Sequence, residues 1–391
     1  MSNKLLKLII YILNTPLYWV SSCMPTNSNI WIFGAWFGEK YADNSKYLFE
    51  YVNQSHSEIR AIWFSTNKNV IRFLNQKGYE AYYTYSWRGY YLGAIAKFVF
   101  LSSAFTDVNQ YVCSTKRTTI IQLWHGTPLK KIHFDDKFNT FLNPTGINHI
   151  IKSIKEWIFP FLGRDYDYMV SSSELVSNCY HSAFRINKKK ILLTGYPRND
   201  VFFNKINNGD KPSIVYMPTH RNEGEFNVTS FFSNHLESIN DKLSQQDITL
   251  YIKLHYYHLN NCNIKNLSNI IYINDKAIDQ DIYTIINNFD ILITDYSSIY
   301  FDYLLSNKPI IFAPFDLEEY TRKDRELYFN YNDVTAGPKC QNWDEVIVEL
   351  IKFISGVDDY KKERQIINNR FNTFQDGNNS KRVVEFIKQQ I

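Results

Sequence analysis

The amino-acid sequence predicts an α/β fold of two doubly wound domains that face each other across a central cleft. Short apolar runs of strand length recur along the chain with helix-length intervals between them, which is typical of parallel sheets covered by helices on both faces. A polar stretch near 203–212 interrupts the series and has the composition of an interdomain linker. The length of 391 residues also exceeds the usual size of one hydrophobic core.

The apolar runs fall into two series, which define a predicted N-terminal domain at 29–205 and a C-terminal domain at 206–391, after a leader at 1–28. Strands of the first domain are expected at 30–35, 59–65, 81–85, 98–102, 119–123, 168–171 and 191–194. Strands of the second are expected at 214–217, 250–254, 270–273, 291–294 and 310–313. Helices are expected at 299–305, 344–353, 358–370 and 381–391.

The stretch 290–316 reads as a strand, a polar turn, a helix and a further strand. Ser297 and Ser298 stand where the helix should begin, so a hydroxyl can cap its first turn while backbone N–H groups face the mouth of the loop. Such a mouth suits a phosphate. A serine cap without any ligand gives the same local pattern, and this stretch alone leaves both interpretations open.

Charge and cysteine content narrow the function classes. The formal net charge of +4 and the pI of about 8.5 are too mild for a dedicated nucleic-acid binder, but they suit a surface that meets anionic lipid or phosphorylated substrate. The five cysteines are scattered without a C-x-x-C pair, which favours reduced thiols in the cytosol and argues against a structural zinc site. These features predict no nucleic-acid partner and no structural zinc; we also expect no other metal and no cofactor.

Two segments are candidates for contact with a membrane surface. In the leader, the apolar run 8–13 is too short to span a bilayer, and Asn14 and Pro16 interrupt the sequence after it, so we expect an amphipathic anchor or a helix packed on the body. In the segment 130–163, lysines interleave with aromatic and aliphatic residues, which suits a surface that dips into anionic headgroups. Ordinary core packing of its apolar face is the alternative.

Polar residues that could bind a ligand or take part in catalysis come directly after several of the predicted strands, where parallel sheets bind their ligands. His125 ends one strand and is followed by Gly126, so that an imidazole suited to general-base work stands beside a residue that lets a ligand approach the backbone. Cationic candidates for phosphate binding are Arg198, Arg221 and Lys253, and His255 is a candidate donor to a phosphate or leaving group. Each of the three cationic residues and His255 could instead be salt-bridged at the surface, whereas the position of His125 at the predicted cleft favours a functional role.

Taken in order, these motifs resemble those of the CDP-glycerol glycerophosphotransferases, the teichoic acid and capsule enzymes. The motifs that carry the resemblance span roughly 29–391 and are LWHGTPLKK, GYPRND, YMPTHR, KLH, ITDYSSIYFDYLL, FDLEEY, AGPK and DGNNS. The resemblance implies a GT-B-like pair of Rossmann-type domains, with a CDP-polyol donor held mainly by the C-terminal half. It also implies a cytoplasmic enzyme that is peripheral on the inner face of the cell membrane, because the acceptors are lipid-linked.

The resemblance also implies roles for individual residues. His125 is similar to the family's candidate base and His255 to its second active-site histidine, while Gly126, Lys130 and Arg198 belong to the acceptor side or its loops. The residues implied to contact the donor are Thr219, Arg221, Lys253, Asp295, Ser297, Ser298, Arg325 and Ser380. The sequence departs from the family's usual pattern at His220, Glu326 and Asn379, which bears on donor and acceptor identity.

The leading hypothesis is therefore transfer of glycerol phosphate from CDP-glycerol to a lipid-linked saccharide or polymer, with release of CMP. Three alternatives remain at this stage: a CDP-ribitol donor, a nucleotide-sugar glycosyltransferase, and a non-catalytic scaffold in a polymer-export assembly.

Overall fold

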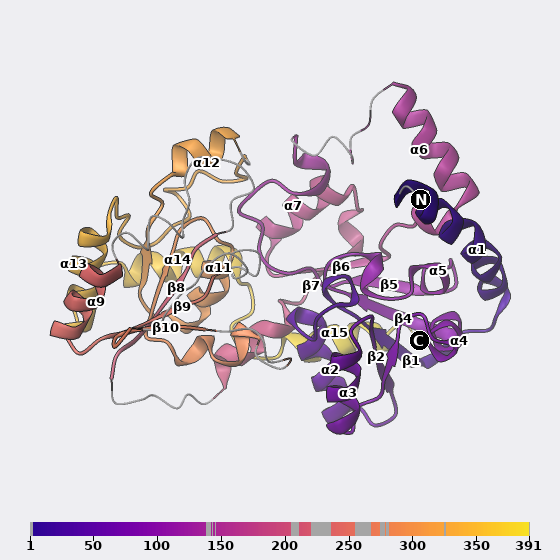
Figure 1. Cartoon of the computed structure of the whole chain (residues 1–391), viewed down its shortest axis with the longest axis horizontal. Coiled ribbons are helices and arrows are strands. Elements are labelled where there is room, and N and C mark those ends of the chain that lie inside the picture. The colour runs from indigo at the N-terminus through magenta and orange to yellow at the C-terminus, as the bar shows by residue number, and fades with distance from the viewer. Residues whose placement is uncertain are drawn as a thin grey trace.

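The computed structural model describes residues 3–137, 142, 144, 146–204, 211–219, 236–254, 267–273, 278, 281–323 and 326–390. The described strands form two parallel sheets, one in each half of the chain (Figure 1). The first sheet consists of β1 Asn27–Phe33, β2 Arg60–Ser65, β3 Ala81–Tyr83, β4 Ala96–Leu101, β5 Thr119–Gln122, β6 Tyr168–Ser171 and β7 Ile191–Leu193. The second consists of β8 Ser213–Met217, β9 Thr249–Ile252, β10 Ile270–Tyr272, β11 Ile291–Thr294 and β12 Ile310–Phe312.

Both sheets are doubly wound. The strand order is β3-β2-β1-β4-β5-β6-β7 in the first sheet and β10-β9-β8-β11-β12 in the second. In each case the order reverses beside the first strand, so the topological switch points lie between β1 and β4 and between β8 and β11. The predicted α/β class with two Rossmann-type sheets is confirmed, and each predicted strand matches an observed one within three residues at either end.

Helices cover the sheets in both halves of the chain. The first half contains α1 Asn3–Cys23, α2 Asp43–Ser55, α3 Lys68–Gln76, α4 Trp87–Ile95, α5 Gln110–Cys113, α6 Ile147–Ile158 and α7 Glu174–Phe184. The second half contains α9 Leu236–Gln245, α11 Ile299–Tyr303, α12 Leu317–Lys323, α13 Trp343–Ile354, α14 Lys361–Phe371 and α15 Asn379–Lys388.

Local sequence explains where several of these elements begin. The strands are apolar on both faces, as the fully buried pattern of β11 and β12 shows, because helices cover both sides of a parallel sheet. At the start of α13, the side chain of Asn342 accepts a hydrogen bond from the N–H of Glu345 at 2.9 Å, and the Glu345 carboxylate accepts one from the N–H of Gln341 at 2.7 Å. This reciprocal cap fixes the first turn.

The last helix crosses back to the first half of the molecule. Although α15 comes after the second sheet in sequence, it packs against α2 and against the short helix η6 Pro197–Phe203 (Figure 1). Its apolar residues Val383, Val384 and Ile387 are fully buried in a core cluster that contains residues of both halves. The C-terminal helix therefore packs the two halves of the chain together.

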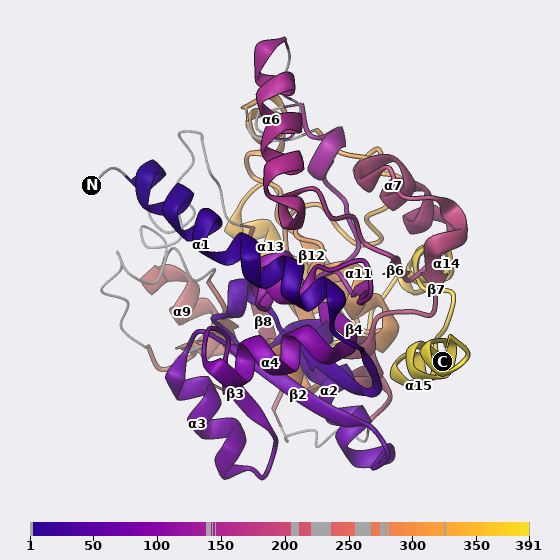
Figure 2. The ribbon, with the colours of Figure 1, turned by 90° about the vertical axis from the view of Figure 1, so that its right-hand side faces the viewer.

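The N-terminal helix α1 lies along the body, across α4 and α5, and α6 projects beside it (Figure 2). With 21 residues, α1 is about 30 Å long, and it extends well beyond the apolar run at 8–13, which by itself is too short to span a bilayer. By length and composition α1 could cross a membrane, and it is the one described helix for which that holds. One face is nevertheless held by the body, since the Tyr90 hydroxyl donates to Asn14 Oδ1 at 2.8 Å and Tyr18 is buried.

Candidate active site between the carboxyl ends of the two sheets

Loops from the two halves meet at the carboxyl ends of their sheets. The loop after β5 carries His125 and Gly126, and the loop after β11 carries Ser297 and Ser298. A Cβ atom added at Gly126 would lie 3.4 Å from Oγ of Ser298 and only 2.7 Å from Nη2 of Arg198. Gly126 also has a φ of +129°, so both its backbone conformation and its surroundings require glycine. The structure thus brings together two of the motifs that were prominent in the sequence.

His125 is oriented as a neutral base. Its Nδ1 atom lies 2.9 Å from the backbone carbonyl oxygen of Ser102 at the end of β4. Because a carbonyl oxygen only accepts, Nδ1 carries the proton, and Nε2 is left with the lone pair that can take a proton from a substrate. The imidazole ring stacks on Trp124 with the ring centres 4.1 Å apart, which fixes its plane.

The surroundings of His125 favour the uncharged imidazole. Burial lowers the pKa of His125 below its ordinary value, although the nearby Asp43 carboxylate and the Ser102 carbonyl oppose this effect. Burial likewise raises the pKa of Asp43, against the effect of its partner Arg198. A histidine whose pKa is lowered stays neutral at physiological pH, as a general base requires.

A buried polar framework holds the histidine loop, and it was not predicted from the sequence. The side-chain amide of Asn44 donates to the carbonyl oxygens of Leu123 and Trp124 at 3.2 and 2.8 Å. Next along α2, the N–H of Ser45 donates to Oγ of Ser102 at 3.1 Å. The sequence 43–45 precedes an apolar helical pattern, so it could have been recognised as a helix start; nothing local indicated that it would reach β4 and β5.

Asp107 fixes two further loops at the same carboxyl end of the first sheet. Its buried carboxylate accepts hydrogen bonds from the N–H groups of Phe37 at 2.7 Å, Ser102 at 2.9 Å and Ser103 at 2.7 Å. Burial raises the pKa of Asp107 to about 6, and the backbone N–H groups act in the opposite direction. Since Ser102 also holds His125, this carboxylate supports the base indirectly.

Backbone strain is concentrated at this carboxyl end of the first sheet. Trp36, Asp43 and Trp124 have φ values of +49°, +65° and +58°, in the left-handed region that side chains with a Cβ disfavour. Such conformations persist only where the surrounding contacts impose them, and they cluster at functional sites.

In the loop after β11, Ser298 does not cap α11, and of the two serines only Ser297 makes a hydrogen bond to the first turn of that helix. Ser298 has helical dihedral angles (φ −67°, ψ −13°) and its hydroxyl makes no capping hydrogen bond, while the Ser297 hydroxyl accepts from the N–H of Ile299 only at 3.5 Å. Since a side chain caps best from an extended residue, the helical conformation of Ser298 turns its hydroxyl away from that role. The Ser298 hydroxyl points instead toward the Gly126 loop.

Thr219 and Asp295 form a linked pair at the switch point of the second sheet. Asp295 comes directly after β11 and is buried; its carboxylate accepts from the N–H of Thr219 at 3.0 Å and from the Thr219 hydroxyl at 2.6 Å. The carboxylate therefore shapes the turn after β8, next to the loop of Ser297 and Ser298. The pair therefore lies at the position in the fold where doubly wound sheets bind nucleotides.

The segment after His125 crosses to the second half. Lys130 pairs with Leu327 in an antiparallel bridge, and the N–H of Lys131 donates to the carbonyl oxygen of Glu326 at 2.8 Å. Nζ of Lys130 lies 6.0 and 5.4 Å from the ring centres of Tyr296 and Tyr320, which stack on each other. Lys130 is thereby directed toward the loop after β11.

Glu326, one of the departures from the family pattern, takes part in the same crossing. Its carboxylate accepts from Nζ of Lys131 at 2.8 Å and of Lys137 at 3.0 Å. These hydrogen bonds, that of Lys131 first, lower the pKa of Glu326.

Arg198 joins the two halves of the chain through buried ion pairs. Its Nη1 donates to Oδ1 of Asp43 at 2.8 Å and its Nη2 to Oδ2 of Asp302 at 2.6 Å, with all three side chains buried. The guanidinium carbon lies 4.4 Å from the ring centre of Tyr283. Arg198 was a candidate phosphate partner in the sequence; both terminal nitrogens are instead paired with carboxylates, one from α2 and one from α11.

Ser380 has a structural role in the described contacts. Its backbone N–H donates to Oδ2 of Asp200 at 2.9 Å, the neighbouring N–H of Asn379 donates to Oδ1 at 2.8 Å, and the side chains of Ser380 and Asn379 are buried. Asp200 thus satisfies the N-terminus of α15 and docks it on η6. The donor contact that the family resemblance implies for Ser380 stays a prediction.

The remaining predicted site residues are Arg221, His255, Arg325 and Lys253. Arg221, His255 and Arg325 lie outside the described residues. Lys253 comes directly after β9, and its N–H donates to the carbonyl oxygen of Tyr216 at 2.9 Å. In the part of the chain that the structure describes, no group of three or more His, Cys, Asp or Glu side chains could hold a metal ion.

Comparisons with known proteins agree with this architecture. The profile of the family described as CDP-Glycerol:Poly(glycerophosphate) glycerophosphotransferase matches residues 17–389. The teichoic acid glycerol-phosphate transferase of Staphylococcus aureus is 28% identical, with 92% of this chain and 93% of that protein covered. The teichoic acid poly(glycerol phosphate) polymerase of Bacillus spizizenii is 29% identical, with 93% and 92% covered. The ribitol-phosphate primase of the same organism is 23% identical, with 99% and 98% covered.

Solved structures show the same fold. The structure of the wall teichoic acid polymerase TagF has a TM-score of 0.78 at 23% identity and covers 98% of this chain and 95% of that one. A UDP-N-acetylglucosamine 2-epimerase from Listeria monocytogenes has a TM-score of 0.56 at 12% identity, with 94% and 97% covered. The predicted GT-B-like arrangement is confirmed by these likenesses.

Proposed function

Because the chain belongs to the CDP-glycerol:poly(glycerophosphate) glycerophosphotransferase family, we propose that it transfers glycerol phosphate from CDP-glycerol to a lipid-linked saccharide or polymer acceptor of the teichoic acid type. The observation that carries the proposal is the meeting of the His125 loop and the loop of Ser297 and Ser298 beside the switch point of the second sheet. One loop carries a candidate base, and the other carries hydroxyls and backbone N–H groups that suit a phosphate, as the reaction needs.

In the proposed reaction, an acceptor hydroxyl attacks the β-phosphorus of CDP-glycerol. The new bond joins the acceptor oxygen to that phosphorus, the bond between the β-phosphorus and the bridging oxygen breaks, and CMP leaves. Nε2 of His125 takes the hydroxyl proton, since Nδ1 is already committed to the Ser102 carbonyl. No covalent enzyme intermediate is needed, so positioning and electrostatics carry the catalysis.

The donor is proposed to lie on the second half. The backbone N–H groups of Ser297 and Ser298 form no hydrogen bond with the described residues, so they are available to the diphosphate. With only five residues, α11 has a weak dipole, and these N–H groups and hydroxyls would supply most of the attraction. Lys253, Arg221, Arg325 and His255 remain proposed donor contacts on the basis of the family motifs.

The identity of the polyol is directly testable. Given the purified protein and a lipid-linked saccharide, we expect CDP-glycerol to release CMP at least about tenfold faster than CDP-ribitol, because a polyol pocket discriminates by the contacts each extra carbon gains or loses. The measurement is CMP release with each donor, with and without acceptor. Faster release from CDP-ribitol would reassign the donor, and turnover of a nucleotide sugar alone would make the protein a glycosyltransferase.

We also propose that the protein is cytoplasmic and attaches to the inner face of the membrane through one apolar surface shared by α1 and α6. No residue of α6 is buried, and Trp157 and Ile147 are 82% and 72% exposed, so the apolar face of this helix does not pack in the core. Tyr11 of α1 contacts Phe159 and Phe161 beyond the end of α6 with ring centres 5.5 Å apart, which joins the two helices. Lys152 and Lys155 add cations suited to anionic headgroups.

Substitution on each helix tests this attachment. Leu13→Asp on α1 and Trp157→Asp on α6 are both expected to reduce by severalfold the fraction of protein that pellets with anionic vesicles, because each places a charge in the apolar surface. Ile366→Asp on α14 is the control, since Ile366 is 61% exposed but lies in the second half. Undiminished pelleting of both variants would move the attachment to another surface.

A further inference from the structure

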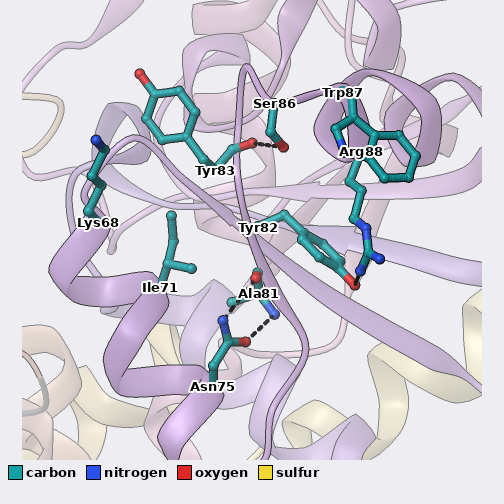
Figure 3. Close-up of a pocket in the computed structure, with 9 residues that line it drawn as sticks. All are labelled: Lys68, Ile71, Asn75, Ala81, Tyr82, Tyr83, Ser86, Trp87 and Arg88. Carbon is teal, nitrogen blue, oxygen red and sulfur yellow. Dashed lines mark hydrogen bonds between the residues drawn. The ribbon is translucent and has the colours of Figure 1, made fainter.

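A second concave site lies on the first sheet, away from the candidate active site. A pocket of about 360 Å³ lies at the edge strand β3, between α3 and the first turn of α4. Its lining is shown in Figure 3 and consists of Lys68, Ile71, Asn75, Ala81, Tyr82, Tyr83, Ser86, Trp87 and Arg88. None of these residues takes part in the active site described above.

The charge of this pocket is positive. Lys68 and Arg88 lie on opposite sides of the pocket in Figure 3, the lining contains no carboxylate, and neither cation forms an ion pair with a described residue. The neighbouring Glu80 carboxylate is paired with Arg60 at 2.6 Å, and this hydrogen bond is the main cause that lowers the pKa of Glu80, with smaller contributions from the Tyr82 hydroxyl and the charge of Arg88. Both cations stand in the first turn of a helix that has no acidic residue there, where the helix dipole disfavours a positive charge. An anionic ligand between the two cations would offset this unfavourable interaction with the helix dipoles.

The rings of the pocket favour a ligand with an apolar carbon face. Trp87 is 73% exposed and Tyr83 is 38% exposed, although large rings are normally covered. The guanidinium of Arg88 lies over the rings of Trp87 and Tyr82, and its Nη1 donates to the Tyr82 hydroxyl at 3.0 Å. These contacts hold the cation next to an open aromatic surface, an arrangement that can take an anion and a polyol carbon chain together.

We propose that this pocket is a distal subsite for the phosphodiester-linked polyol chain of the acceptor, a proposal that rests on the proposed transferase function. Lys68, Trp87 and Arg88 of the pocket lie at the carboxyl end of the first sheet, as His125 does, because they stand in the first turns of the helices that follow β2 and β3, while His125 follows β5. Four strand spacings separate β3 from β5, which is on the order of 19 Å. A chain of several repeating units could reach from His125 to the pocket, and a single unit could not.

The test measures binding without turnover. A synthetic oligomer of glycerol phosphate is titrated by calorimetry into the His125→Ala protein in the absence of donor. The variant that also carries K68A and R88A is expected to bind at least about tenfold more weakly, because two charge-assisted contacts are lost. The matched control carries K189A and K190A, which remove the same charge from exposed positions beside β7 at the other edge of the sheet.

Turnover supplies an independent readout. In the wild-type background, K68A/R88A should lower kcat/KM for a long phosphate-bearing acceptor relative to that for a short one, through a higher KM. Equal oligomer affinity with and without the two cations would overturn the subsite, as would equal loss in the control variant. If inorganic tripolyphosphate bound as tightly as the oligomer, recognition of the polyol would be excluded. If K68A/R88A weakened binding only to phosphatidylglycerol vesicles, the pocket would be assigned to lipid headgroups. Charge-dependent oligomer binding without CMP release by the wild type would contradict the transferase function and leave the pocket's chemistry intact.

Discussion

Replacing His125 by alanine is expected to lower the turnover of CDP-glycerol by a factor of about a hundred or more, with the protein still folded. The expectation rests on the ring's geometry: Nδ1 is held by the Ser102 carbonyl, so Nε2 is the atom that can accept the hydroxyl proton. His125→Gln should be equally impaired, although its amide retains a hydrogen-bond donor. CMP release under saturating donor and acceptor measures the effect.

The pH profile of the unmodified enzyme should carry the same signature. Because burial lowers the pKa of His125, the imidazole stays neutral below the ordinary value of about 6.5, and activity is lost only as the pH falls through the lowered pKa. His181→Ala is the matched control, since its Nδ1 also meets a backbone carbonyl but lies on the outer helix α7. Turnover by His125→Ala close to the wild-type rate would remove His125 from the role of base.

The positions of the strands could be predicted because each one leaves a local record. A parallel strand covered on both faces is apolar along its whole length, as in 291–294, and the turns between strands are polar. The partner of an element leaves no such record. The sequence predicted a helix near 381–391, yet nothing in it indicated that α15 would pack against α2 and not against the second sheet.

The candidate site divides in the same way. His125, Gly126 and the two serines were recognisable because strand ends and glycine mark where ligands approach. The capping role was wrong for Ser298 because the same hydroxyl can cap a helix or face a neighbouring loop, and only the backbone angles of Ser298 decide between the two. The supporting carboxylates Asp107 and Asp43 were missed because a buried acid and a solvated one look alike in sequence.

Arg198 shows the limit most clearly, since its two partners are 155 and 104 residues away. Replacing it by alanine would leave Asp43 and Asp302 buried without their cation, so we expect a loss of about 3–5 kcal/mol in the free energy of unfolding. Arg198→Lys should recover only part of this loss, because a single ammonium group cannot reproduce two separate guanidinium contacts. Urea unfolding of the wild type, Arg198→Lys and Arg198→Ala measures the free energy of unfolding, which we expect to decrease in that order.

Activity separates this role from that of an ordinary buried ion pair. Arg198 lies under Gly126 and binds Asp302 on the helix that comes after Ser298, so it sets the relative position of the base loop and the donor loop. The matched control is Arg364→Ala, which removes an equally buried arginine from Asp358 in the second half. At a temperature where all variants are folded, we expect kcat to fall at least tenfold for Arg198→Ala, because a small misplacement of reacting groups is costly. Arg364→Ala should lose stability while retaining kcat. Positioning of the two loops is the property that distinguishes Arg198 from Arg364. An equal loss of kcat in both variants would therefore show that Arg198 is only a stabilising residue.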